Sequence, residues 1–166
     1  MLQSVRRRTW APRGQTPIQK VWGRHDRLSV IAALTVSPRR QRLGLYFRIQ
    51  DHNIRADHVM AFLKELRRHL RRNTILVMDR WSVHRTVARR LRQGRFTWAT
   101  VEWLPSYAPE LNPVEQVWSH TKCADLANYI PDDIDKLRRE VERSIQRKRS
   151  RRSLLRSFFQ HARLDL

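Results

Sequence analysis

The residues best placed for chemistry are two carboxylates, Asp79 and Glu115, each at the boundary of a distinct sequence pattern. Asp79 directly follows the apolar run 74–78, and Glu115 comes shortly after Asn112. Carboxylate oxygens are the ligands that Mg²⁺ and Mn²⁺ prefer in proteins. The sequence therefore predicts a pair of acids that can hold a divalent metal ion.

Local patterns place these acids on a strand and a helix. A short apolar run bounded by polar residues indicates a buried strand, so Asp79 is predicted at a strand's carboxyl end, where open α/β sheets bind ligands. Asn112 followed by Pro113 is typical of a helix start, with Asn112 as N-cap and Glu115 in the first turn. Two simpler interpretations stay open: Asp79 as a turn residue, and Glu115 as the capping-box partner of Asn112.

Several segments around the acids resemble the DDE transposases of the mariner superfamily, in its bacterial insertion-sequence branch. These segments are Val77-Met78-Asp79, Ser82-Val83-His84, Trp103 to Glu115, and Val117-Trp118. The likeness extends from about residue 5 to about residue 122, and 104–118 is its most specific part. The string 8–14 is similar to the loop that follows the first catalytic strand of that family.

The resemblance implies a function and a set of roles. Asp79 would be the second and Glu115 the third carboxylate of a catalytic triad that binds two Mg²⁺ (or Mn²⁺) ions and acts on the DNA of transposon ends and target. Two such ions can clamp the entering and leaving oxygens of a phosphodiester. His84 would orient a carboxylate or contact phosphate, although a surface histidine is equally compatible with its position. Asn112 is expected as a cap and Trp118 as a core residue that fixes the helix.

The first carboxylate of the triad has no match in the sequence. Asp26, Asp51, Asp57 and Glu102 were weighed for the role, and none lies at the tip of a central strand before the predicted hairpin. The family's first strand, which carries that aspartate, would end just before Met1. We therefore expect a truncated domain that is inactive alone, with codons for the missing strand and a helix-turn-helix upstream.

Composition defines the class of protein and its partner. The chain has 166 residues, 40% of them hydrophobic, which suits one globular domain. A net charge of +20 predicts a polyanionic partner, first of all DNA, although a basic protein such as a ribosomal one has similar composition. Cys123 is the only cysteine, which excludes a disulfide framework and fits the bacterial cytoplasm. No run reaches the roughly 18 apolar residues of a membrane span.

Basic residues at both ends are the predicted DNA contacts, because arginine and lysine neutralise backbone phosphates. They are Arg6, Arg7, Arg8 and Arg13 near the N-terminus, and Arg147, Lys148 and Arg149 near the C-terminus. Trp10 and Trp22 could stack on bases or cover a sheet edge. The arginines near the end of the helix predicted at 55–71 are explained equally well by the helix dipole.

The predicted elements follow a recognisable order. Strands are expected at 28–36, 43–49, 74–79 and 96–104, with helices at 55–71, from Ser82 to about Gly94, from Asn112, and twice within 124–166. This order matches an α/β, RNase H-like mixed sheet lacking its first strand, with a C-terminal helical tail. The predicted divisions are a basic N-terminal arm at 1–27, the incomplete catalytic core at 28–122, and basic C-terminal helices at 123–166.

Three functions compete at this stage. The first is a DDE transposase catalytic domain; the second is a DNA-binding remnant without catalysis; the third is an RNase H-like nuclease that uses only the two matched acids. Metal-dependent cleavage by this chain alone separates the third from the second. A homodimer is compatible with the sequence, which does not fix the oligomeric state.

Overall fold

The computed structural model describes Arg8, residues 10–15 and residues 28–166. Its elements are β1 (Ser29–Val36), β2 (Leu43–Gln50), α1 (Ala56–Leu70), β3 (Thr74–Met78), α2 (Ser82–Gln93), β4 (Ala99–Trp103), a 3-10 turn at Pro109–Leu111, α3 (Pro113–His120), a π-helical turn at Thr121–Asp125, α4 (Ile134–Arg149) and α5 (Arg152–His161). Across these described ranges, no helix combines the length and apolar character that a membrane crossing requires.

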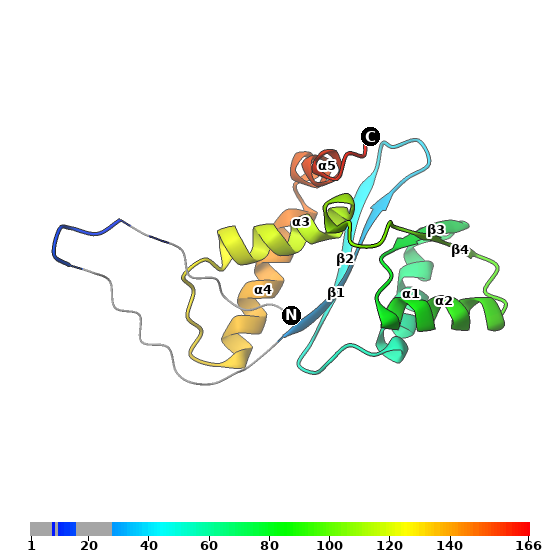
Figure 1. Cartoon of the computed structure of the whole chain (residues 1–166), viewed down its shortest axis with the longest axis horizontal. Coiled ribbons are helices and arrows are strands. Elements are labelled where there is room, and N and C mark those ends of the chain that lie inside the picture. Colours follow the sequence, from blue (N-terminus) through cyan, green and yellow to red (C-terminus); the bar gives the residue numbers. More distant parts are fainter. Residues whose placement is uncertain (1–7, 9, 16–27) are drawn as a thin grey trace.

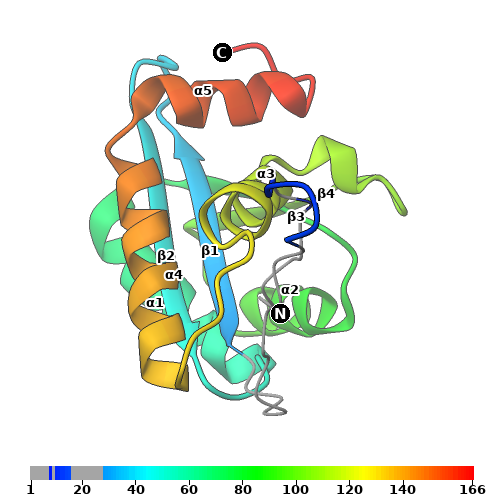
Figure 2. The ribbon, with the colours of Figure 1, turned by 90° about the vertical axis from the view of Figure 1, so that its left-hand side faces the viewer.

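The hairpin β1–β2 is the longest strand pair. Its antiparallel register aligns Ser29 with Gln50 and Val36 with Leu43. The side chains of β1 alternate between two apolar clusters. Val30, Ala32 and Leu34 pack on the cluster formed with α3, α4 and α5, whereas Ile31 and Ala33 pack on the cluster formed with α1 and α2. The hairpin is thus covered by helices on both faces (Figures 1 and 2).

Strands β3 and β4 form a separate parallel pair, aligned from Thr74 with Ala99 to Met78 with Trp103. Within the described residues, the strands thus form two two-stranded sheets rather than one continuous sheet. Leu76 faces the α1–α2 cluster and is buried. Ile75 and Val77 point the other way and are 67% and 59% exposed, which is unusual for apolar strand residues.

Strand β4 begins later than the predicted start at residue 96. Arg95 has a left-handed backbone with φ of 55 replaced by 51°, and Thr97 N donates to Arg95 O, which makes a tight turn after α2.

 The φ of Arg95 itself is 51°, and 55° is the value at Arg40 and Arg71. A Cβ on Gly94 would lie 2.5 Å from Cε2 of Phe96, so the ring of Phe96 requires glycine there. The turn therefore takes up the first residues of the predicted strand.

A buried polar network joins the π-helical turn to α4. Lys148 is 1% exposed. Its ammonium group donates to Asp125, and to Ser144 Oγ at 2.7 Å, while Ser144 Oγ donates to Asp125 Oδ2 at 2.6 Å. Buried charges persist in proteins when they are paired in this way. The prediction that Lys148 contacts DNA is therefore wrong for this fold, because its charge is directed into the interior.

The Lys148–Asp125 pair gives a stability prediction. Lys148→Ala should lower the free energy of unfolding by about 3–5 kcal/mol, because it leaves Asp125 without its cation and opens a cavity. Arg147→Ala is the matched control, since Arg147 is exposed and pairs only at the surface with Glu140; it should cost less than about 1 kcal/mol. Urea unfolding of both variants measures the difference. Equal losses would contradict the assignment.

Candidate functional site

Asp79 lies directly after the last residue of β3, as predicted. Its Oδ1 accepts a hydrogen bond from Trp81 N at 3.0 Å and another from His84 Nδ1 at 2.7 Å. These two bonds fix the carboxylate at the start of α2. Ser82 was predicted as the N-cap of this helix, but it is the first helical residue and Trp81 occupies the cap position. Asp79 binds the Trp81 amide through its side chain.

Glu115 lies in the first turn of α3. Asn112 Oδ1 accepts from Val114 N at 3.2 Å, which confirms Asn112 as the N-cap, and Pro113 follows as the first helical residue. Burial raises the pKa of Glu115, and the nearby negative charge of Asp79 raises it further, whereas Lys122 opposes the shift. The two predicted acids therefore interact electrostatically, although they come from distant parts of the chain.

Asp79 and Glu115 share a groove with their predicted supporting residues. The groove has a volume of ≈ 1370 Å³, and its lining includes Asp79, His84, Asn112, Glu115 and Trp118. Trp118 is half-buried and packs on the cluster of α3, α4 and α5, in line with the expectation of a core residue that holds its helix. His84 is bonded to Asp79, so of its two proposed roles the structure supports orientation of a carboxylate.

The donor set of this site suits a hard divalent cation. Mg²⁺ retains waters and substrate oxygens, so it needs few protein carboxylates. Asp79 and Glu115 supply oxygen ligands, and His84 supports Asp79 as outer partners of metal ligands commonly do. Over the described ranges, no group of three or more acidic, histidine or cysteine side chains is assembled for a metal. The pair thus fits one hard cation and does not by itself supply the three acids expected for two.

The other predicted DNA contacts have different surroundings. Arg6 and Arg7 lie outside the described residues, as does Trp22. Arg8 and Arg13 are exposed, and Trp10 between them is fully exposed. Arg147 is exposed beside Glu140, and the guanidinium of Arg149 lies 5.6 Å from the centre of the Tyr46 ring. Exposed cations of this kind remain available for phosphate.

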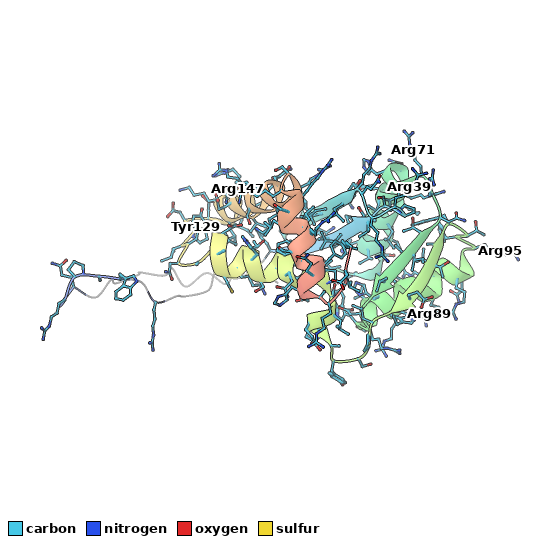
Figure 3. The ribbon with its side chains drawn as sticks, turned by 90° about the horizontal axis from the view of Figure 1, so that it is seen from above. Arg39, Arg71, Arg89, Arg95, Tyr129 and Arg147 are labelled. Atoms are coloured by element: carbon cyan, nitrogen blue, oxygen red, sulfur yellow. The ribbon has the colours of Figure 1, made fainter. Side chains whose placement is uncertain are left out.

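A concentration of arginines on and beside α2 was not singled out from the sequence. These residues are exposed: Arg80, Arg85, Arg89, Arg90, Arg92 and Arg95. Figure 3 shows Arg89 and Arg95 projecting from the end of the molecule that carries the β3–β4 pair. Their number within residues 80–95 is the signal that could have identified them, because the apolar positions Val87 and Leu91 leave the rest of the helix to solvent.

The bond between His84 and Asp79 gives a prediction for metal affinity. His84→Ala should weaken Mn²⁺ binding by about 10–100-fold, because outer partners orient the ligating carboxylate. Isothermal titration calorimetry measures the affinity. His161→Ala, an exposed histidine of α5, is the matched control and should leave the affinity unchanged. An unaltered affinity in His84→Ala would show that the bond is only structural.

The environment of Glu115 gives a prediction for stability and pH. Its pKa is raised above the ordinary value of 4.5. The corresponding stability is therefore present below the unfolded-state pKa and is lost as the pH rises through the folded-state pKa. Glu115→Gln removes this loss, so at pH 7 with EDTA the variant should melt at a higher temperature than the wild type, and at pH 4 the difference should shrink. Each ~1 kcal/mol corresponds to about 2–4 °C in a domain of this size. A gain that is equal at both pH values would contradict this account.

Comparisons with known proteins agree with this geometry. The structure described as "Crystal structure of the Mos1 Strand Transfer Complex" is similar with a TM-score of 0.59 and 16% sequence identity, covering 98% of this chain and 47% of that chain. The likeness confirms the predicted RNase H-like α/β fold, and this chain spans about half the length of that one. No curated protein matches the chain significantly. The family model described as "DDE superfamily endonuclease" matches residues 1–138, so the chain belongs to the DDE superfamily endonucleases.

Proposed function

We propose that this chain is the catalytic domain of a transposase that cleaves and joins DNA in the transposition of a bacterial insertion sequence. The observation that carries the proposal is the meeting of Asp79 and Glu115 in one groove, with His84 bonded to Asp79. The family and the fold support it. The net charge of +20 suits a DNA substrate, and the single cysteine suits the bacterial cytoplasm.

The chemistry follows from the two acids. Asp79 and Glu115 would hold Mg²⁺ or Mn²⁺, which supplies charge neutralisation on the phosphodiester and lowers the pKa of an oxygen nucleophile. His84 keeps the Asp79 carboxylate in a fixed orientation, and the Asn112 cap fixes the turn from which Glu115 projects. The half-buried position of Glu115 reduces competition from water, which strengthens its interaction with a cation.

We further propose that the chain is inactive alone. Two acids are brought together in the described residues, whereas the resemblance implies three. A metal pair held by two acids would bind weakly and lie loosely, and small misplacement of reacting groups costs orders of magnitude in rate. A non-catalytic DNA-binding role is the second candidate function, and this same count of acids favours it.

A Mn²⁺ titration tests the site. Wild-type protein should bind Mn²⁺, and Asp79→Asn and Glu115→Gln should each reduce the affinity by at least about tenfold, because each removes one charged ligand. Asp57→Asn is the control, since Asp57 is exposed and paired with Arg90 outside the groove. Binding that survives both site substitutions would refute the assignment of the metal to this pair.

A further inference from the structure

The groove beside Asp79 extends between the two sheets. Residues 30–36 of β1 line one side and residues 74–79, which include β3, line the other. In the described part of the chain, β1 pairs only with β2, and β3 only with β4. Figure 1 shows the β3–β4 pair beside the β1–β2 hairpin. Each sheet thus presents an edge strand to the same groove.

The edges determine which kind of ligand can satisfy them. The outer N–H and C=O groups of an edge strand have no ladder partner, and an unpaired buried group is costly. An extended polypeptide provides alternating donors and acceptors on both of its sides. A helix uses these groups internally, so it would leave both edges unpaired. The ligand that the edges favour is therefore a β-strand that pairs with both sheets.

The two faces of the groove determine the side chains of that strand. Val30, Ala32 and Leu34 pack on the cluster of α3, α4 and α5, while Ile31 and Ala33 pack on that of α1 and α2. A strand beside β1 would lie between the same two apolar clusters. Strands covered on both faces are almost continuously apolar. Proline is excluded from them because it cannot donate to the ladder.

The size and charge of the groove narrow the ligand further. Its ≈ 1370 Å³ exceeds the roughly 300–1,000 Å³ of small-molecule sites. Its lining also includes Arg39 and Arg42, which follow β1, and Arg72, which precedes β3. Figure 3 shows Arg39 and Arg71 on the same side of the molecule. Acidic residues flanking the apolar run of the ligand would complement these arginines.

We propose that the groove binds a β-strand donated by a different polypeptide: an uninterrupted apolar segment of at least about five residues, roughly 17 Å long, flanked by acidic residues. The donor is not among the four described strands, because each already has its place in a hairpin or a parallel pair. The proposal does not rest on the proposed function, since both edges would accept the strand whether or not Asp79 and Glu115 act on DNA.

The probe is a fluorescent synthetic peptide with eight valine, isoleucine and leucine residues and two glutamates at one end. Its affinity for the full chain is measured by fluorescence anisotropy at about 0.5 M salt, where the Debye length falls to a few ångströms and charge attraction is suppressed. The control peptides have the same sequence with alternate amides N-methylated, in both alternations. They retain the apolar side chains and lose ladder donors, so each should bind at least about tenfold more weakly.

Two matched variants test the location. Ile75→Lys and Thr100→Lys alter exposed residues paired with each other across β3 and β4, but only Ile75 lines the groove. Ile75→Lys should weaken peptide binding by at least about tenfold, and Thr100→Lys should not. Because the peptide is acidic and both variants add a positive charge, a loss in Ile75→Lys cannot come from charge repulsion.

Hydrogen exchange provides the third measurement. Bound peptide should slow the exchange of amides in residues 30–36 and 74–78. Equal binding by the N-methylated peptides, equal effects of the two lysine variants, or unchanged exchange in β1 and β3 would each overturn the proposal. Self-association of the chain that blocks the peptide would also overturn it, because the occupant would then be a second copy.

Discussion

The 166-residue chain alone is expected to cleave DNA that carries transposon ends at no measurable rate with Mg²⁺ or Mn²⁺. A longer version with the in-frame residues encoded upstream, including an aspartate that follows an apolar strand, is expected to cleave it. In that version, Asp79→Ala and Glu115→Ala should each reduce the rate by about 10³-fold or more. Metal ions supply several kcal/mol to the transition state, and each ~1.4 kcal/mol is tenfold in rate.

A gel assay of strand cleavage on matched transposon ends measures this effect. Asp57→Ala is a suitable control, because Asp57 pairs with Arg90 away from the groove. Cleavage by the 166-residue chain that disappears in Asp79→Ala would refute the expected inactivity and favour an RNase H-like nuclease. Full activity of Asp79→Ala in the longer version would refute the site itself.

DNA binding by this chain should be tight at low salt and should fall steeply as salt rises. Arginine and lysine side chains that neutralise phosphates release condensed counterions. With 6–10 phosphate contacts, the affinity is expected to fall by about 10³–10⁵-fold between 50 and 200 mM salt. The net charge of +20 and the exposed arginines of α2 make such a number of contacts attainable. Electrophoretic shift assays across this range measure the slope.

Charge reversal locates the binding surface. Arg147→Glu with Arg149→Glu should weaken binding and reduce the salt slope, whereas Asp132→Lys with Asp135→Lys should not weaken it. Lys148 is left unaltered, because it is buried and its replacement would destabilise the fold. Affinity independent of salt would contradict phosphate neutralisation, and equal effects of the two double variants would show that only the net charge matters.

The sequence alone identified most elements, because periodicity and capping act over short distances. The apolar run 74–78 became β3 with Asp79 at its end, and Asn112 caps α3 through the Val114 amide. The apolar positions of the last two helices became the buried faces of α4 and α5. Boundaries were less accurate where side chains interact locally: Phe96 packs over Gly94 and delays β4, and the Asp79 carboxylate binds the Trp81 amide.

Tertiary structure decided the features that depend on residues far apart in the chain. The run 147–149 is uniformly basic in sequence, yet Lys148 lies on the same helix face as Val141 and Ile145, and Asp125 meets it there. The spacing of Asp79 and Glu115 could not show that their charges interact, because the fold of all intervening elements brings them together. The groove between β1 and β3 is likewise invisible in sequence, since strand pairing is a long-range choice that local propensity does not fix.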